Sequence, residues 1–270
     1  MTAEVTTVEL PTGVTVQYVE QGDSAGVAVL FVHGLSDSWH SFEPVLPHLP
    51  RSIRAYALTQ RGHGDSDRPA AGYATRDFAA DIAAFMDALE LEAGVIVGHS
   101  MGSFAARRFA IDYPERTVGL VLIGALATED NPGLAEVQEA VSTLADPVDE
   151  AFVREFQQST LVRPVPPAFF ETVVRESLKV PAHVWRAAVA GISDDDSSAE
   201  LDRIEAPTLI LAGERDELCP RSEQEALAAK IPNARLVVYP GTGHGLHWEE
   251  PERFASDLVA FIQAAAGRRA

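Results

Sequence analysis

The chain has 270 residues, of which 46% are hydrophobic, and its formal net charge is −19 at pH 7. This length is sufficient for one sizeable core, and the strongly acidic balance argues against nucleic acid or an anionic membrane surface as a partner. No apolar run approaches the roughly 18–20 residues of a membrane-spanning helix, residues 1–13 lack the pattern of a signal peptide, and the single cysteine, Cys219, excludes an internal disulfide. We therefore expect a cytoplasmic protein.

Short apolar runs along the chain predict a mostly parallel sheet. Near the N-terminus, Val14, Val16 and Tyr18 alternate with polar residues, which is typical of an antiparallel edge strand. Unbroken apolar runs follow, and helical patterns at spacings of three and four separate them. The runs cover residues 27–32, 53–58, 95–97, 120–123, 208–212 and 236–239, and the clearest helical faces lie at 78–89 and 254–262. This alternation predicts an α/β fold with helices on both faces of the sheet.

One interval interrupts the alternation of strands and helices. Between residues 127 and 204 the pattern is helical throughout, with segments at 134–144 and 151–156 and a long stretch at 169–189. A simple crossover between parallel strands needs far fewer residues. We expect residues 127–204 to form a helical cap inserted into a core made of residues 1–126 and 205–270, without contributing a strand.

The segment Gly98–Gly102 places a serine between two glycines at a junction of strand and helix. A β-branched run precedes it, and a helical pattern that must end before Pro114 follows. This is the arrangement of a nucleophile elbow, in which a strained turn exposes the serine hydroxyl. Ser100 is therefore the candidate nucleophile.

A serine hydroxyl needs a base and an orienting acid, which in this arrangement follow later strands in the order nucleophile, acid, base. Asp216 follows the run at 208–212, and His244 lies in a glycine-rich loop after the run at 236–239. We predict Asp216 as the acid and His244 as the base. Four acidic residues and one histidine remain as alternatives: Glu129, Asp130, Glu214, Glu217 and His247.

The oxyanion formed on attack by Ser100 requires two preorganised N–H donors. The backbone N–H groups of Met101, the residue after the nucleophile, and of Leu35, in the loop after the run at 27–32, are the candidates. Gly34 is expected to let that loop bend sharply, and His33 to brace it by hydrogen bonds. The residues predicted to line a substrate pocket are His33, Trp39, Phe169, Phe170 and Trp185. No spacing of histidines predicts a metal site.

Taken together, these motifs resemble the α/β-hydrolases, in particular the bacterial group of carboxylesterases, lactonases, cofactor-free haloperoxidases and carbon–carbon bond hydrolases. The resemblance rests on the His33–Gly34 loop, the Gly98–Gly102 elbow, and the segments at 61–69, 112–116, 213–220 and 244–252. It implies an eight-stranded sheet, no cofactor, Ser100, Asp216 and His244 as the catalytic residues, and Leu35 and Met101 as oxyanion donors. One departure is Thr59, where relatives often carry aspartate.

We therefore expect a serine hydrolase that cleaves a small, largely apolar ester or lactone through an acyl-enzyme, as a monomer or homodimer. Carbon–carbon bond hydrolysis and haloperoxidase or perhydrolase activity are alternatives within the enzyme class, although carbon–carbon hydrolases often carry asparagine at the position of His99. A ligand sensor that retains the fold without turnover is the alternative outside it. Fold resemblance alone leaves the reaction open.

Overall fold

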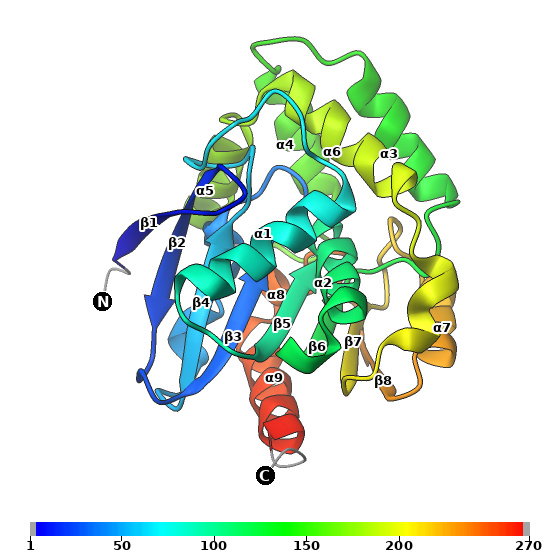
Figure 1. The fold of residues 1–270 in the computed structure, drawn as a ribbon. Helices are drawn as coiled ribbons and strands as arrows, with labels where there is room; N and C mark the ends of the chain where they lie inside the picture. Colours follow the sequence, from blue (N-terminus) through cyan, green and yellow to red (C-terminus); the bar gives the residue numbers. More distant parts are fainter. Residues whose placement is uncertain (1–3, 267–270) are drawn as a thin grey trace.

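A computed structural model describes residues 4–266 as a twisted sheet with helices on both faces (Figure 1). The eight strands lie in the order β1-β2-β4-β3-β5-β6-β7-β8. The strands β1 and β2 are antiparallel to each other and β2 is antiparallel to β4, whereas all other neighbours are parallel. Their bounds are β1 Val5–Glu9, β2 Thr15–Gln21, β3 Val27–Val32, β4 Ile53–Thr59, β5 Gly94–His99, β6 Thr117–Ile123, β7 Thr208–Gly213 and β8 Ala234–Tyr239.

Alternate residues of the central strands pack on opposite faces of the sheet, because successive side chains of a strand point in opposite directions. In β3, Leu30 and Val32 belong to the core cluster that includes residues of α1 (Thr75–Ala88) and α2 (Met101–Asp112). Val29 and Phe31 of the same strand pack with α9 (Pro251–Ala266) on the other face. Both faces are therefore covered, which explains why the central strands are apolar without alternation.

The remaining helices of the core connect the strands or precede α9. They are α7 (Arg221–Lys230), α8 (Leu246–Glu249) and the 3-10 helices η1 (Trp39–Phe42), η2 (Leu46–His48) and η3 (Pro114–Arg116). The helical faces predicted at 78–89 and 254–262 coincide with the buried sides of α1 and α9. The predicted α/β class, with its mostly parallel eight-stranded sheet, is confirmed.

A helical insertion separates β6 from β7, as the sequence predicts. It consists of α3 (Pro132–Ser142), α4 (Glu150–Ser159), α5 (Pro167–Ser177), α6 (Ala182–Asp194) and η4 (Ser198–Arg203), and residues 127–204 contain no strand in the described chain. The stretch at 169–189, predicted as continuous, is two helices. Proline disfavours helical backbone in the residue before it, and Pro181 stands immediately before α6 as its N-cap.

The insertion is tied to the core by buried polar contacts. Arg107 of α2 donates to the carbonyl oxygen of Leu126, to Ser197 Oγ and to the carboxylate of Glu129. On the other side of the insertion, Gln157 of α4 reaches the loop after β3. No helix within residues 4–266 has the length and apolar character to cross a membrane.

Candidate active site

Ser100 lies at a strained corner between β5 and α2. Its backbone has φ 52° and ψ −120°, in a region that non-glycine residues rarely adopt. A side chain on Gly98 would collide with the carbonyl group of Gly102, and one on Gly102 would collide with that of Val32. The two glycines are therefore required because the turn packs backbone against backbone, and the Ser100 side chain is left facing a pocket.

Asp216 and His244 are brought into contact from two adjacent strand ends. Asp216 Oδ2 lies 2.9 Å from Nδ1 of His244, and both side chains are almost completely buried. The other carboxylate oxygen of Asp216 accepts the backbone N–H groups of Leu218 and Cys219, at 3.0 and 2.8 Å. The carboxylate is thus held by its own loop and presents one oxygen to the imidazole.

Gly124, the residue after β6, makes room for this contact, and sequence reasoning missed it. Its φ is +53°, and a side chain there would lie 2.7 Å from Cε1 and 2.8 Å from Nδ1 of His244. A glycine that directly follows a strand at the carboxyl edge of the sheet was the available signal. A larger residue would push the imidazole away from Asp216.

The carboxylate of Asp216 also governs the protonation of His244. Burial alone lowers the pKa of an imidazole, but the negative charge and the hydrogen bond of Asp216, helped by the charge of Asp37, outweigh it, so that the pKa of His244 is raised above 6.5. Because the carboxylate accepts the proton on Nδ1, the free lone pair of neutral His244 is on Nε2.

The alternative acids occupy other places. Glu214 and Glu217 are exposed, and Glu214 accepts the backbone N–H of Gly241. Asp130 is exposed as well, whereas the carboxylate of Glu129 is buried against the guanidinium of Arg107. Among the candidate acids, the contact with His244 is made by Asp216.

The alternative base, His247, lies on the first turn of α8 and is fully buried. Its Nε2 lies 3.3 Å from Ser41 Oγ, and burial lowers its pKa to about 3. The side chain packs against the rings of His99 and Phe42 and is not among the residues that line the pocket beside Ser100. Its surroundings are those of a packed core histidine.

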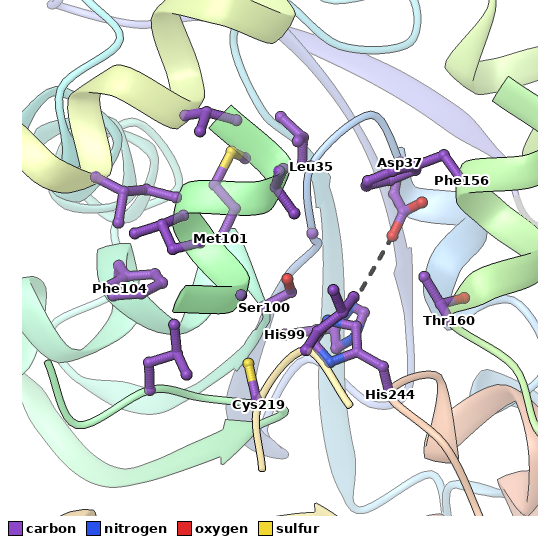
Figure 2. Close-up of a pocket in the computed structure, with 18 of the residues that line it drawn as sticks. Leu35, Asp37, His99, Ser100, Met101, Phe104, Phe156, Thr160, Cys219 and His244 are labelled. Atoms are coloured by element: carbon purple, nitrogen blue, oxygen red, sulfur yellow. Dashed lines mark ion pairs between the residues drawn. The ribbon is translucent and has the colours of Figure 1, made fainter. Parts of the chain in front are cut away.

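The pocket beside Ser100 lies between the sheet edge and the insertion, and contains about 650 Å³ of space not filled by atoms. Figure 2 shows Ser100 near its centre, between Met101 and Phe104 on one side and Asp37, Thr160 and His244 on the other. Residues of α3, α4 and α6 supply much of the remaining wall, namely Leu134, Val137, Phe156, Gln157, Val189 and Ile192. The insertion therefore covers the carboxyl edge of the sheet at Ser100.

The aromatic residues predicted to line the pocket from the insertion do not do so in the described chain. Trp185 is fully buried, and its ring packs edge-on against those of Phe152 and Phe156. Phe170 packs against the core, and Phe169 packs on Trp248. The prediction is therefore corrected. Sequence periodicity does not determine how each helix is rotated relative to the pocket, and in the structure these rings pack against neighbouring helices instead of lining it.

His33 and Trp39, the two residues outside the insertion that were predicted to line the pocket, are not among its lining residues either. His33 Nε2 accepts the backbone N–H of Gln60 and its Nδ1 lies 2.8 Å from the carbonyl oxygen of Gly34, which is the bracing role expected for it. Trp39 opens η1 and stacks on His40. Trp248, which the sequence analysis did not single out, lines the pocket instead.

The proposed oxyanion donors both border the pocket. Met101 is the first residue of α2, so its N–H precedes the first intrahelical hydrogen bond. Gly34 was expected to allow a sharp bend, but its φ is not in the left-handed region. A side chain at this position would instead crowd the site, since its Cβ would lie 3.0 Å from His99 Nδ1 and 3.2 Å from Ser100 Cβ. Leu35 follows it in the same loop.

Asp37 and His99 are buried polar residues that line the pocket and were not predicted to do so. Asp37 is buried, and its carboxylate accepts hydrogen bonds from Gln157 at 3.2 Å and from Ser41 at 3.3 Å. Burial raises the pKa of Asp37 to about 7, although these hydrogen bonds oppose the shift. Nothing in the sequence around Asp37 indicates that this aspartate is buried, because it stands in a polar loop. The one available signal was its position three residues after Gly34 in the His33–Gly34 loop.

One group of side chains has the composition of a metal site. Ligand atoms of Asp216, Cys219 and His244 lie within 4.8 Å of one another. Two of the three are already paired with each other, and burial raises the pKa of the Cys219 thiol well above its usual value, with the charge of Asp216 adding to the shift. A metal ion would have to displace the thiol proton and separate the Asp216–His244 pair.

Comparison with known proteins agrees with this architecture. Residues 27–251 match the family model described as alpha/beta hydrolase fold. The chain is 29% identical to a non-heme chloroperoxidase of Streptomyces lividans, over 96% of this chain and 99% of the relative. It is 31% identical to a bifunctional esterase/perhydrolase of Acinetobacter calcoaceticus, over 93% and 97%. A thermophilic esterase from Thermogutta terrifontis has a similar structure, with a TM-score of 0.87, 25% identity and coverage of 97% and 99%.

Proposed function

Since the chain belongs to the α/β-hydrolase fold family, we propose that it is a serine hydrolase that cleaves a small, largely apolar carboxylic ester or lactone. Ser100 is the nucleophile, His244 the general base and Asp216 the acid that orients it. The observation that carries the proposal is the buried contact of 2.9 Å between Asp216 and His244, beside a pocket that both His244 and the strained Ser100 line. A carboxylate and imidazole close to a serine on the wall of a pocket form the constellation of nucleophilic acyl transfer.

The reaction begins when Nε2 of neutral His244 takes the hydroxyl proton of Ser100 and Oγ attacks the substrate carbonyl carbon. The backbone N–H groups of Leu35 and Met101 stabilise the oxyanion, where a preorganised donor is worth about 3–4 kcal/mol. His244 then gives the proton to the leaving oxygen, and the carbon–oxygen bond breaks. The carboxylate of Asp216 stabilises the imidazolium that exists between the two transfers.

A water molecule completes the cycle by attacking the acyl-enzyme with His244 again as the base. In a lactone the leaving oxygen stays tethered to the acyl group, so a single product is released. The apolar side chains Met101, Phe104 and Leu134 on the pocket wall favour an apolar substrate. Residues 127–204 act as a cap in this proposal, because α3, α4 and α6 close the pocket over Ser100.

The decisive test is hydrolysis of a short p-nitrophenyl ester by the wild-type protein and by two variants. We expect turnover that Ser100→Ala abolishes and that His247→Ala, altering a buried histidine outside the pocket, retains. Binding of the ester without turnover by the wild-type protein would contradict the enzyme proposal and support a ligand sensor. Loss of turnover in His247→Ala together with its retention in His244→Ala would contradict the assignment of the base.

Perhydrolysis is a second candidate reaction at the same site. The relatives named as chloroperoxidase and esterase/perhydrolase match almost the whole chain, and hydrogen peroxide can replace water as the attacking group on the acyl-enzyme. The products would then be a peracid and the regenerated Ser100 hydroxyl, with no change in the roles of His244 and Asp216. Peracid formation from an ester and hydrogen peroxide, absent in Ser100→Ala, is the corresponding measurement.

A further inference from the structure

Polar side chains are distributed unevenly around Ser100 on the pocket wall. On one side of Ser100 lie Met101 and Phe104, and α3 and α6 contribute further apolar side chains to the wall. On the other side lie Asp37 and Thr160, beside the ring of Phe156. Gln157 is hydrogen-bonded to Asp37, and the ring of His99 adjoins that of His244. We call the four polar residues Asp37, His99, Gln157 and Thr160 the polar subsite. Figure 2 shows Asp37 and Thr160 on this second side, which is also the side of His244.

The polar subsite has hydrogen-bonding capacity that the protein does not satisfy. His99 is 2% exposed, and no side chain among the described residues is hydrogen-bonded to either of its ring nitrogens. Its Nδ1 lies 3.9 Å from the nearer carboxylate oxygen of Asp37, beyond hydrogen-bond distance. Burying an unsatisfied polar atom costs free energy, so a ligand group that pairs with His99 or Asp37 here would recover part of that cost.

The position of His244 indicates which part of the substrate reaches this subsite. In the proposed reaction His244 delivers the proton to the leaving oxygen, so the alcohol portion of the ester must lie on the His244 side of Ser100. The rings of His99 and His244 are adjacent, with centroids 4.9 Å apart. The acyl portion is then directed toward Met101 and Phe104.

A hydroxyl group is the substituent that fits these partners. Burial, together with the neighbouring imidazoles of His247 and His244, lowers the pKa of His99 well below its usual value, although a hydrogen bond with the backbone of His244 opposes the shift. The ring is therefore neutral, with one N–H donor and one acceptor nitrogen. A hydroxyl placed between Nδ1 of His99 and the carboxyl group of Asp37, which are 3.9 Å apart, can accept a hydrogen bond from one of them and donate to the other. A carboxylate on the substrate would instead face the carboxyl group of Asp37, and the described residues of the pocket wall include no lysine or arginine to pair with it.

We propose that the polar subsite binds a hydroxyl group on the alcohol portion of the substrate, so that preferred substrates are monoesters of short polyols with an apolar acyl chain. This inference rests on the proposed function for the orientation of the ester. It assigns Asp37 and His99 to the recognition of the leaving alcohol, and Gln157 to holding the carboxylate of Asp37 through its bond of 3.2 Å.

The test uses two esters of equal size, 2-hydroxyethyl butyrate and propyl butyrate, which differ in one terminal hydroxyl or methyl group. Calorimetric titration of the Ser100→Ala protein measures binding without turnover, and wild-type kcat/KM measures the reaction. We expect the hydroxyl ester to be favoured roughly five- to tenfold in both, the effect of one well-made hydrogen bond. Equal binding, or tighter binding of the propyl ester, would overturn the inference.

Two variants and one control locate the effect. Asp37→Leu and His99→Phe remove the two groups assigned to hydroxyl recognition, and each should bring the ratio of kcat/KM between the two esters toward one. Phe104→Leu alters the apolar side and should change both esters in parallel, so that the ratio remains. Because the ratio is internal to each protein, a partly unfolded variant cannot imitate the result.

Failure of the inference and failure of the proposed function give different results. If the wild-type protein hydrolyses neither ester, the serine hydrolase proposal fails for this substrate class, and the binding ratio of Ser100→Ala still decides the inference. If it hydrolyses both esters equally and the subsite variants leave the ratio unchanged, hydrolase activity stands and hydroxyl recognition is wrong.

Discussion

Replacing Asp216 by asparagine should abolish most of the activity for a reason visible in the surroundings of the carboxylate. One oxygen of Asp216 accepts two backbone N–H groups, from Leu218 and Cys219, while the other faces Nδ1 of His244. In Asp216→Asn, the amide oxygen must take the place before the two N–H groups, because an NH₂ group there would oppose two donors. The NH₂ group therefore turns toward His244.

The consequence is the wrong tautomer of the base. With a donor opposite Nδ1, His244 must carry its proton on Nε2, where the lone pair for Ser100 is needed. The same change in a serine protease lowers kcat about 10⁴-fold, which corresponds to about 5 kcal/mol of transition-state stabilisation. We expect a loss of that size here, with KM little changed, since Asp216 is not part of the pocket wall.

The assay is steady-state hydrolysis of p-nitrophenyl butyrate, with circular dichroism to verify folding. Glu129→Gln is the matched control, because it neutralises another buried carboxylate, one paired with Arg107 instead of a histidine. We expect it to keep kcat and to lower the free energy of unfolding. If folded Asp216→Asn retains kcat within tenfold of the wild type, the reasoning about the tautomer is refuted, and loss of turnover in Glu129→Gln would point to that residue instead.

Three further predictions concern the same site. Ser100→Ala and His244→Ala should each lower kcat by several orders of magnitude, and the double variant should be little worse, because nucleophile and base act as one unit; additive losses would contradict this. The value of kcat/KM should fall as the pH drops and His244 becomes protonated, with a midpoint above 6.5 because Asp216 raises the pKa of His244. NMR titration should show that the pKa of His244 is lowered in Asp216→Asn, and an unchanged pKa would refute the cause. Gly124→Ala should lower kcat about 100-fold, because its methyl group displaces the imidazole of His244. The control is Gly13→Ala, at a positive φ with no neighbouring atom within reach of the new methyl group, which should lower the melting temperature without changing kcat. Equal kcat in the two variants would contradict the steric argument.

Features that depend on neighbouring residues in the chain could be predicted from the sequence. The strand β3, predicted at residues 27–32, has the same bounds in the structure, and the buried sides of α1 and α9 match their predicted faces. The elbow at Ser100 was recognisable because a serine between two glycines stands at a junction of strand and helix. The requirement for Gly98 arises within that turn, whereas Gly102 is required by the close approach of Val32 in β3. Asp216 and His244 could be paired in advance because adjacent parallel strands end at the same edge of the sheet.

Features that depend on contacts between distant segments needed the tertiary structure. The aromatic residues Trp185 and Phe169 were sensible candidates for the pocket, yet the structure turns them against Phe152 and Trp248. Helical periodicity shows which residues share a face, but the neighbour that each face meets depends on how the helices of the insertion pack on one another.

The polar subsite illustrates the same division. Asp37 belongs to the loop after β3 and Gln157 to α4, 120 residues apart in the sequence, and their hydrogen bond exists only because the insertion folds back over the sheet. The candidate nucleophile, acid and base could be recognised from local motifs, since each lies shortly after the end of a strand. The shape and polarity of the pocket were decided by tertiary packing, because burial of a side chain is a property of what surrounds it and not of its place in the chain.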